Sequence, residues 1–318
     1  MTMLQSYDLK GKKLSFANWI SNLSPSETPF TSMTGKESVQ QTMYQWQTDS
    51  LNAATDNAVA EGASADSTEK PRMTAVHSNV TQILRKVVKV SDTANALANY
   101  GRGKELQYQM DKAGKEIKRD LELAFLTQGA KVEGNATTIA RRTAGFKGLV
   151  AAKGATDEDT GAIVHADGAL SEAKIFDMTY NLYLAGSNAN IIMFHPKHAT
   201  VFSALQERDG GGRQRIFENT PKFSVFVSTI VDPLGQEYKL LPNRWMPEDA
   251  VYFFTPADWT QMVLRAPQRT KLAKDGSYEK WMLEMEVGLR HRNPFASGIL
   301  NITGGAPVAE VKAIVKAK

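Results

Sequence analysis

The sequence of 318 residues contains no cysteine, which excludes disulfide bonds and thiolate metal sites. It has no run of about 18 apolar residues, so no membrane-spanning helix is expected. The first residues, MTMLQSYDLKGKKLSF, lack the apolar stretch of a secretory signal. This predicts a protein made and used in the cytoplasm, or inside a particle assembled there. Packing, hydrogen bonding or association must therefore stabilise the fold.

Motifs for nucleotide binding and hydrolysis are also missing. Residues 129–135 place Asn135 where a phosphate loop needs its lysine, and no G-x-S-x-G elbow occurs. His195 and His198 have no third ligand nearby in the sequence, so we interpret them as surface residues and not as metal ligands. We predict no catalytic residue, cofactor or metal, which favours a structural role.

The overall composition is that of a globular protein with nearly balanced charge. Hydrophobic residues make up 42% of the chain, and the 38 basic and 34 acidic side chains give a formal charge of +4. This mild surplus does not by itself indicate nucleic-acid binding. The length suits two intertwined domains with a sizeable core.

The N-terminal third has the pattern of extended structure. Residues 1–37 predict an arm, with a short helix at 14–23, because Pro25 and Pro29 disfavour helix at the residues that precede them. Residues 38–51 and 78–90 have strand patterns, and the small polar residues between them predict a mobile tip. The simplest assembly is a long two-stranded hairpin, which is marginal alone and needs a partner.

Residues 104–128 give the strongest helix signal. One face is apolar, and we assign Glu122 to the opposite, charged face; the apolar residues are Leu106, Met110, Ala113, Ile117, Leu121 and Ala124. After a connector at 130–168, alternating helices and strands predict an α+β domain, which begins with a helix capped by Ser171. Residues 281–289 predict a long strand with one buried face.

Several short motifs then point to one family. Pro25, Glu27-Thr28-Pro29-Phe30, Gly35-Lys36, Trp46, Asp49 and Leu51 match the signature "isP.eTPF…GK…W..D.L". Further matches are EGA at 61–63, VSDTA at 90–94, EIKRDLELAFL at 116–126, RRTAGF at 141–146 and VGLRHRNPFASGIL at 287–300. With the order of parts, the chain resembles a tailed-bacteriophage major capsid protein of the Hong Kong 97 fold, podovirus-type subfamily. The resemblance covers nearly the whole chain, although its motifs are packing motifs.

The resemblance implies an α+β fold with defined parts. These are an N-arm at 1–37, an extended E-loop hairpin at 38–95, a peripheral domain with a long spine helix at 96–140, an axial domain at 141–268, a peripheral-domain return strand at 269–303 and a C-terminal tail at 304–318. The implied function is self-assembly as hexamers and pentamers into an icosahedral shell, built in the host bacterial cytoplasm, that encloses double-stranded DNA. DNA contact would not depend on base sequence.

Further partners implied by the resemblance are scaffolding and portal proteins, with a decoration protein as another option and no membrane. The residues expected at contacts between subunits are Glu27, Pro29, Phe30, Trp46, Asp49, Arg213 and Arg215. We expect Trp46 to be buried only in the shell, because its strand is predicted to have no core within its own chain. The glycines at 210–212 would place Arg213 or Arg215 near the capsomer axis, beside an acidic group of an adjacent subunit.

Two alternatives stay open at this point. An encapsulin-type compartment shell shares the implied fold and would enclose protein cargo, although residues 27–30 favour the phage family. A monomeric DNA-modifying or hydrolytic enzyme is the other alternative. Particle size, measured by light scattering or negative-stain microscopy, separates a shell from a monomeric enzyme.

Overall fold

The computed structural model describes residues 24–49, 51–52, 54–64, 73–99, 103–135, 138–150, 163–166, 170–204 and 229–302. The predicted helix at 14–23, part of the predicted tip, the glycines at 210–212 with Arg213 and Arg215, and the C-terminal tail lie outside these residues. The chain divides into two compact units. The smaller unit includes Arg85–Lys118 and Pro267–Glu284, and the larger includes Thr28–Leu84, Arg119–Ala266 and the chain from Met285.

The larger unit contains a six-stranded sheet with the order β5-β12-β9-β6-β8-β7. Its strands are β5 (Ile163–Ala166), β6 (Ile191–Phe194), β7 (Thr229–Val231), β8 (Glu237–Pro242), β9 (Ala250–Phe254) and β12 (Gly298–Ile302). Every residue of β6 and β9 is buried, as expected for central strands covered on both faces. The alternating strands predicted for the α+β domain are present here as β6, β7, β8 and β9.

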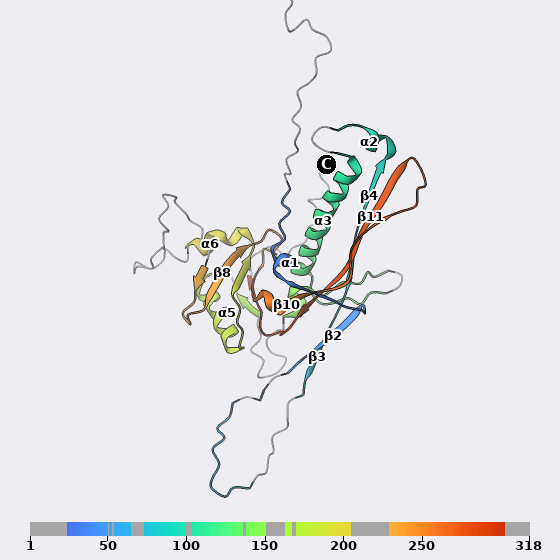
Figure 1. Ribbon diagram of the computed structural model, residues 1–318. Helices are drawn as coiled ribbons and strands as arrows, with labels where there is room; N and C mark the ends of the chain where they lie inside the picture. The colour runs from blue at the N-terminus through green and yellow to red at the C-terminus, as the bar shows by residue number, and fades with distance from the viewer. Residues whose placement is uncertain are drawn as a thin grey trace, which may run out of the picture. The chain divides into compact units, whose positions relative to one another are not determined.

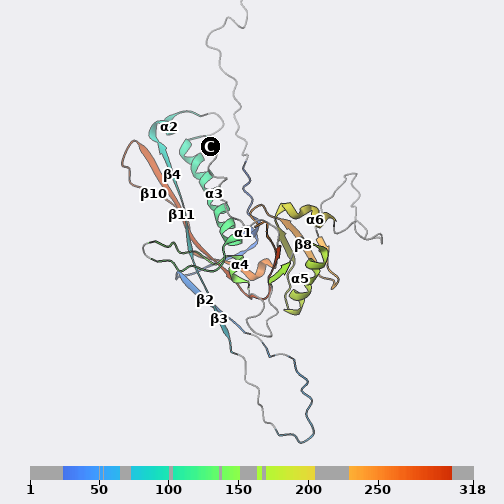
Figure 2. The same ribbon diagram turned by 180° about the vertical axis from the view of Figure 1, so that it is seen from behind.

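Helix α5 (Glu172–Leu184) packs on this sheet at β12, and Figures 1 and 2 both show it beside the sheet. A Cβ atom at Gly298 would lie 1.9 Å from the Met178 methyl group, so glycine at this position leaves room for the Met178 side chain between helix and sheet. Ser171 is the N-cap residue as predicted, but its side chain makes no capping hydrogen bond. The 3-10 helix η1 (Pro196–His198) and α6 (Ala199–Ala204) follow β6.

A second sheet has the order β1-β10-β11-β4. Its strands are β1 (Gly35–Ser38), β4 (Gln82–Ser91), β10 (Trp259–Lys271) and β11 (Tyr278–His291). The long strands contribute residues to both units. The prediction that β11 has one buried face is wrong for its second half, where Glu286 and Gly288 are buried as well. Glu286 is buried because two arginines and a threonine surround it, and Gly288 because a tyrosine ring lies on it.

Helix α3 (Glu105–Thr127) confirms the predicted long helix almost to the residue. The apolar positions from Met110 to Ala124 are buried, and Leu106 is half-buried. The assignment of Glu122 to the charged face was wrong, since its exposed fraction is 0%. Among the described residues, no helix is long and apolar enough to cross a membrane.

The predicted hairpin is present, but its second strand is divided. Strand β2 (Met43–Thr48) pairs antiparallel with β3 (Ala75–Val80), so that Met43 lies opposite Val80. The chain then leaves this pair at Thr81 and enters β4, in the other sheet. The prediction of one continuous strand at 78–90 was therefore wrong, because Thr81 is held by side-chain contacts described below. The remaining short helices are α1 (Pro29–Met33), α2 (Asp92–Ala96), α4 (Phe146–Leu149) and η2 (Pro256–Asp258).

Candidate assembly interface

Phe30 lies in the core of the larger unit and anchors helix α1 there. Its exposed fraction is 0%, and its ring makes edge contacts with four aromatic rings at centroid distances of 5.5–6.4 Å. These rings belong to Phe125, Phe146, Phe254 and Trp259. The expectation that Phe30 lies at a contact between subunits was wrong, because its own chain buries it completely. A buried cluster of this kind is a strong intramolecular anchor.

The buried carboxylate of Glu122 holds helix α1 in place. Its Oε1 accepts hydrogen bonds from the backbone N–H of Phe30 and from Asn243 Nδ2, both at 2.8 Å. Its Oε2 accepts one from the backbone N–H of Thr31, also at 2.8 Å. Glu122 thus satisfies amide groups that have no partner within the first turn of α1. Burial raises the pKa of Glu122, while these hydrogen bonds act in the opposite direction.

Glu27 lies between Pro25 and Pro29, shortly before Phe30 in the sequence. Pro29 is the first residue of α1, where the missing N–H of proline costs nothing. Pro29 is half-buried, and Glu27 is exposed just before it. The anchoring side chain of this motif is Phe30.

The aromatic face of the hairpin is packed partly within its own chain. The Tyr44 and Trp46 rings stack at a centroid distance of 6.1 Å, and Trp46 lies 5.9 Å from the His77 ring. The Tyr44 hydroxyl donates to the Leu289 carbonyl at 2.8 Å, and a Cβ atom at Gly288 would lie 2.4 Å from that hydroxyl. The premise that this strand has no core in its own chain was therefore wrong for Tyr44.

Trp46 differs from Tyr44, because it remains half-buried. Its indole N–H is shielded from solvent and has no hydrogen-bond partner among the described residues. Buried indole N–H groups usually have a hydrogen-bond acceptor. The described residues of the single chain do not supply one to Trp46. The placement of Trp46 at a contact between subunits stays a prediction.

Asn79 connects the hairpin to the body of the larger unit. Its side chain is fully buried. The Nδ2 atom donates to the Leu289 carbonyl at 2.6 Å and to Thr143 Oγ1 at 3.0 Å, and Oδ1 accepts from the Ala144 N–H at 2.8 Å. One side chain thus joins β3 to β11 and to the segment before α4. These bonds fix the root of the hairpin.

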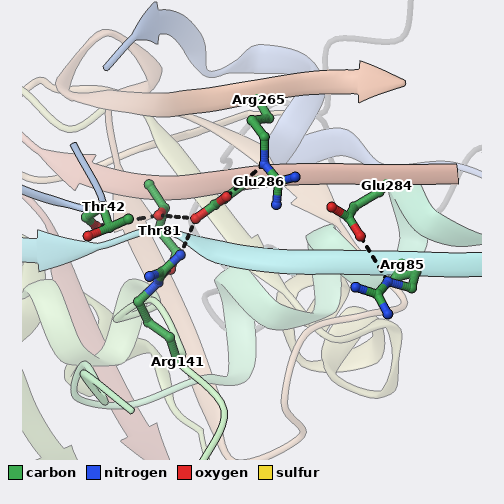
Figure 3. A network of polar contacts seen from close by, with 7 residues as sticks. All are labelled: Thr42, Thr81, Arg85, Arg141, Arg265, Glu284 and Glu286. Carbon is green, nitrogen blue, oxygen red and sulfur yellow. Dashed lines mark hydrogen bonds and ion pairs between the residues drawn. The ribbon is translucent and has the colours of Figure 1, made fainter. Parts of the chain in front are cut away.

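Figure 3 shows a second connection, centred on the buried carboxylate of Glu286. Its Oε1 accepts from Thr81 Oγ1 at 2.8 Å and pairs with Arg141, and its Oε2 accepts from Arg265 Nε at 2.9 Å. Arg141 Nε also donates to the Thr81 carbonyl at 2.6 Å, and the Thr81 N–H donates to the Thr42 carbonyl at 2.8 Å. Two arginines and a hydroxyl compensate the burial of this carboxylate. We call Tyr44, Asn79, Thr81, Arg141 and Glu286 the hairpin elbow.

Figure 3 also includes an ion pair of the smaller unit. Arg85 Nε donates to Glu284 Oε2 at 2.8 Å, which links β4 to β11. The arginine side chain is 57% exposed, so this pair contributes little to stability. The strong polar contacts of the hairpin region are those of the elbow.

Beyond the elbow, the hairpin carries apolar side chains that its own chain does not cover. We call them the hairpin apolar surface: Met43 (39% exposed), Leu51 (93%), Val59 (78%), Met73 (91%) and Val76 (58%). Asp49, at the end of β2, is also exposed. Five exposed apolar side chains among the described residues between 43 and 76 make this segment a candidate interaction surface.

The other predicted sites contribute less. Arg213 and Arg215 lie outside the described residues. His195 accepts a hydrogen bond from the Lys197 N–H, and a His198 ring nitrogen lies 2.8 Å from the Glu248 carbonyl oxygen. The part of the chain that the structure describes contains no group of three or more His, Asp or Glu residues that could hold a metal ion.

Sequence reasoning missed the elbow, although a signal was present. Asn79 and Glu286 are polar residues inside strands, where apolar residues would alternate with exposed ones, and Thr81 lies between β3 and β4. A polar residue in such a place indicates a buried hydrogen-bond network only when its partners are known. The partners here lie up to 210 residues away in the sequence, so the pattern of one strand cannot show them.

Comparison with known proteins gives consistent results. Residues 3–304 match the family model of the SU10 major capsid protein. The major capsid protein of Escherichia phage Phieco32 is 55% identical over 350 residues, which include 97% of this chain and 99% of the relative.

Solved structures share the fold at low identity. The capsid of a native GTA particle superposes with a TM-score of 0.66 at 13% identity and covers 93% of this chain and 97% of its own. The SrpI encapsulin complex from Synechococcus elongatus PCC 7942 has a TM-score of 0.57 at 12% identity, with 92% of this chain and 92% of its own covered. These likenesses concern the fold alone.

Proposed function

The chain belongs to the SU10 major capsid protein family, and from this premise we propose that its copies assemble as hexamers and pentamers into an icosahedral shell around double-stranded DNA. It is a phage major capsid protein with the Hong Kong 97 fold and not an enzyme. An encapsulin-type compartment is the weaker alternative, because the encapsulin likeness is 12% identical whereas the phage relative is 55% identical.

The proposed mode of assembly rests on the structure of the hairpin. Its root is fixed by the buried elbow, while its apolar surface beyond the elbow stays uncovered. A rigid root makes the hairpin a directed arm, so an apolar surface on an adjacent copy can bury it without a large loss of entropy. Each copy gives one arm and receives another, and many modest contacts add up around a closed shell.

The proposed parts keep the boundaries expected from the sequence. Residues 38–95 form the E-loop, 96–140 include the spine helix α3, and 141–268 form the axial domain, with 1–37 as the N-arm and 269–303 as the peripheral return strand. Assembly takes place in the cytoplasm of the bacterial host. Scaffolding and portal proteins take part, and a decoration protein is a further partner. Contact with the duplex is electrostatic and independent of base sequence.

A mutational experiment tests the role of the hairpin apolar surface. The full chain is expressed with the scaffolding protein of its own phage, and shells are counted by negative-stain microscopy. We expect Val59→Asp with Val76→Asp to reduce the shell yield by more than about tenfold, since each 1.4 kcal/mol of lost contact costs about a factor of ten. A charge on this surface must lose its hydration when an adjacent copy covers it.

The matched control is Leu97→Asp with Ile139→Asp, which changes two similarly exposed apolar residues outside the hairpin. The control should assemble as the wild type does. Equal yields from the two variants would show that the hairpin apolar surface plays no special part. Nuclease-treated particles that contain protein cargo in place of DNA would support the encapsulin alternative.

A further inference from the structure

Positive charge is concentrated in the smaller unit. Its segments Arg85–Lys118 and Pro267–Glu284 contain twelve basic and seven acidic side chains, a surplus of five within 52 residues. The whole chain has 38 basic and 34 acidic residues, so everything outside these segments has one more acidic than basic residue. Such asymmetry between parts of a chain indicates an anionic partner for the basic part.

The lysines of α3 are placed for such a partner. Lys112, Lys115 and Lys118 are exposed, and they follow one another at intervals of about 4.5 Å along the helix axis. None of the three has an ion-pair partner among the described residues. The acidic side chains close to them are engaged elsewhere, since Asp111 pairs with Arg269 and Glu116 with Lys86. Unpaired like charges on neighbouring turns repel each other, and an external anion relieves that repulsion.

A hollow beside this row of lysines is also basic. It has a volume of about 280 Å³ and lies between β4 and α3 within the smaller unit. Lys86, Lys89 and Lys112 line it together with one carboxylate, that of Glu116. Figures 1 and 2 both show β4 beside α3. The Lys89 ammonium group lies 3.5 Å from the centre of the Tyr278 ring, which restrains it at the rim.

We propose that this surface, formed by Lys86, Lys89, Lys112, Lys115 and Lys118, binds the phosphate backbone of the enclosed duplex. The proposal rests on the proposed function, which supplies the duplex. Lysine ammonium groups are point charges that neutralise phosphates without reading bases. A row of lysines beside a hollow suits an extended polyanion that is bound regardless of its base sequence. Charge complementarity is the reason for choosing the duplex as the occupant.

The test is a titration of the purified full-length chain with a fluorescent DNA duplex, followed by anisotropy. Two duplexes of unrelated sequence are used, from about 50 to 200 mM salt. We expect equal affinity for both duplexes. We expect Lys112→Gln with Lys115→Gln and Lys118→Gln to bind more weakly, with the slope of log affinity against log salt reduced by about one for each lysine that contacts a phosphate.

A matched control removes the same charge from the larger unit. It is Lys36→Gln with Lys239→Gln and Arg244→Gln, all exposed side chains that belong neither to the elbow nor to the anchor. The control should keep the wild-type slope. An equal reduction in both variants would overturn the proposal, because it would show an effect of net charge alone. Unchanged DNA binding together with lost binding to the purified scaffolding protein would also overturn it, in favour of a protein-docking surface.

A second measurement separates this proposal from the proposed function. Shells made by the α3 variant are counted, and the DNA that they protect from nuclease is measured per shell. Normal shell numbers with less protected DNA support the proposal. Normal shells with normal DNA content overturn it and leave the proposed function intact, whereas absence of shells from the wild-type chain itself contradicts the proposed function.

Discussion

At the residue scale, two buried carboxylates organise the larger unit, and they do so differently. Glu286 has two arginine partners, so its negative charge is compensated within the fold. Glu122 has only neutral donors, two backbone amides and one asparagine. Burial without a cationic partner raises the pKa of the Glu122 carboxyl group. Glu122 is therefore the residue through which pH acts on the anchor of α1.

This difference leads to a prediction on pH dependence. Because burial raises the pKa of Glu122 in the folded chain, the folded chain binds this proton more tightly than the unfolded chain does. The free energy of unfolding should then fall as pH rises from the ordinary carboxyl range through the raised pKa. Glu122→Gln removes this titration and leaves the Thr31 N–H facing an amide group, at a cost of about 1–3 kcal/mol.

Urea unfolding of the unassembled chain at several pH values between 4 and 8 measures both effects. The variant should be less stable than the wild type but should lose less stability as pH rises. An identical pH dependence of the two proteins would show that Glu122 does not titrate in this range. Glu284→Gln is a suitable control, because Glu284 pairs with the exposed Arg85.

At the element scale, the hairpin depends on its elbow more than on its own ladder. Strands β2 and β3 form a two-stranded sheet, which is marginal alone. The bonds of Asn79 and Tyr44 to the Leu289 carbonyl hold this sheet to β11. The hairpin should therefore keep its direction only while these buried bonds are intact.

Substitution of Asn79 tests this dependence. Asn79→Ala leaves the Ala144 N–H without its acceptor and the Leu289 carbonyl with the Tyr44 hydroxyl alone. We expect a loss of about 2–4 kcal/mol in the free energy of unfolding. The amides of β2 and β3 should exchange faster with deuterium, because local opening becomes easier. Asn57→Ala, at an exposed position of the tip, is the control and should change neither quantity. Unchanged exchange at β3 in Asn79→Ala would contradict the role of the elbow.

The elements themselves were largely predictable from the sequence. Helix α3 and strands β6 and β9 follow from the spacing or the continuity of apolar residues, which local patterns record. The break at Thr81 and the burial of Glu122 and Glu286 were not predictable in the same way. Each depends on partners distant in sequence, such as the Phe30 amide for Glu122 and Arg141 for Glu286. The spacing of apolar residues predicts which face of a helix or strand is buried, but it does not predict which residues that face contacts.

The candidate site was predictable only in outline. The sequence singled out residues 27–30 and Trp46, and the structure gives both a definite environment. It moved Phe30 from the predicted interface into the core, because four aromatic rings converge on it from α3, α4, β9 and the start of β10. Such convergence is a property of the tertiary fold. The family signature identified the important residues without distinguishing an anchor from a contact.

At the scale of the whole molecule, the described part of the single chain has exposed apolar groups and an unpaired donor, and we propose that contacts in the shell cover them. The hairpin apolar surface is uncovered, and the indole N–H of Trp46 has no acceptor among the described residues. A protein that folds alone would gain stability by covering such groups. Since the family builds homo-oligomeric shells, an adjacent copy of the same chain is the natural source of the missing contacts.

Trp46 allows a test that separates folding from assembly. Trp46→Phe keeps a ring against Tyr44 and His77 but removes the N–H, so the unfolding of the single chain should change by less than about 1 kcal/mol. If an adjacent copy supplies the acceptor, shells of Trp46→Phe should dissociate at lower denaturant concentration than wild-type shells. Trp46→Ala should weaken each contact further, by about 2–4 kcal/mol, as expected for a buried aromatic anchor. Light scattering during denaturant titration of purified shells measures this loss. If both variants give the same shell yield and the same shell stability as the wild type, Trp46 is not an anchor between subunits.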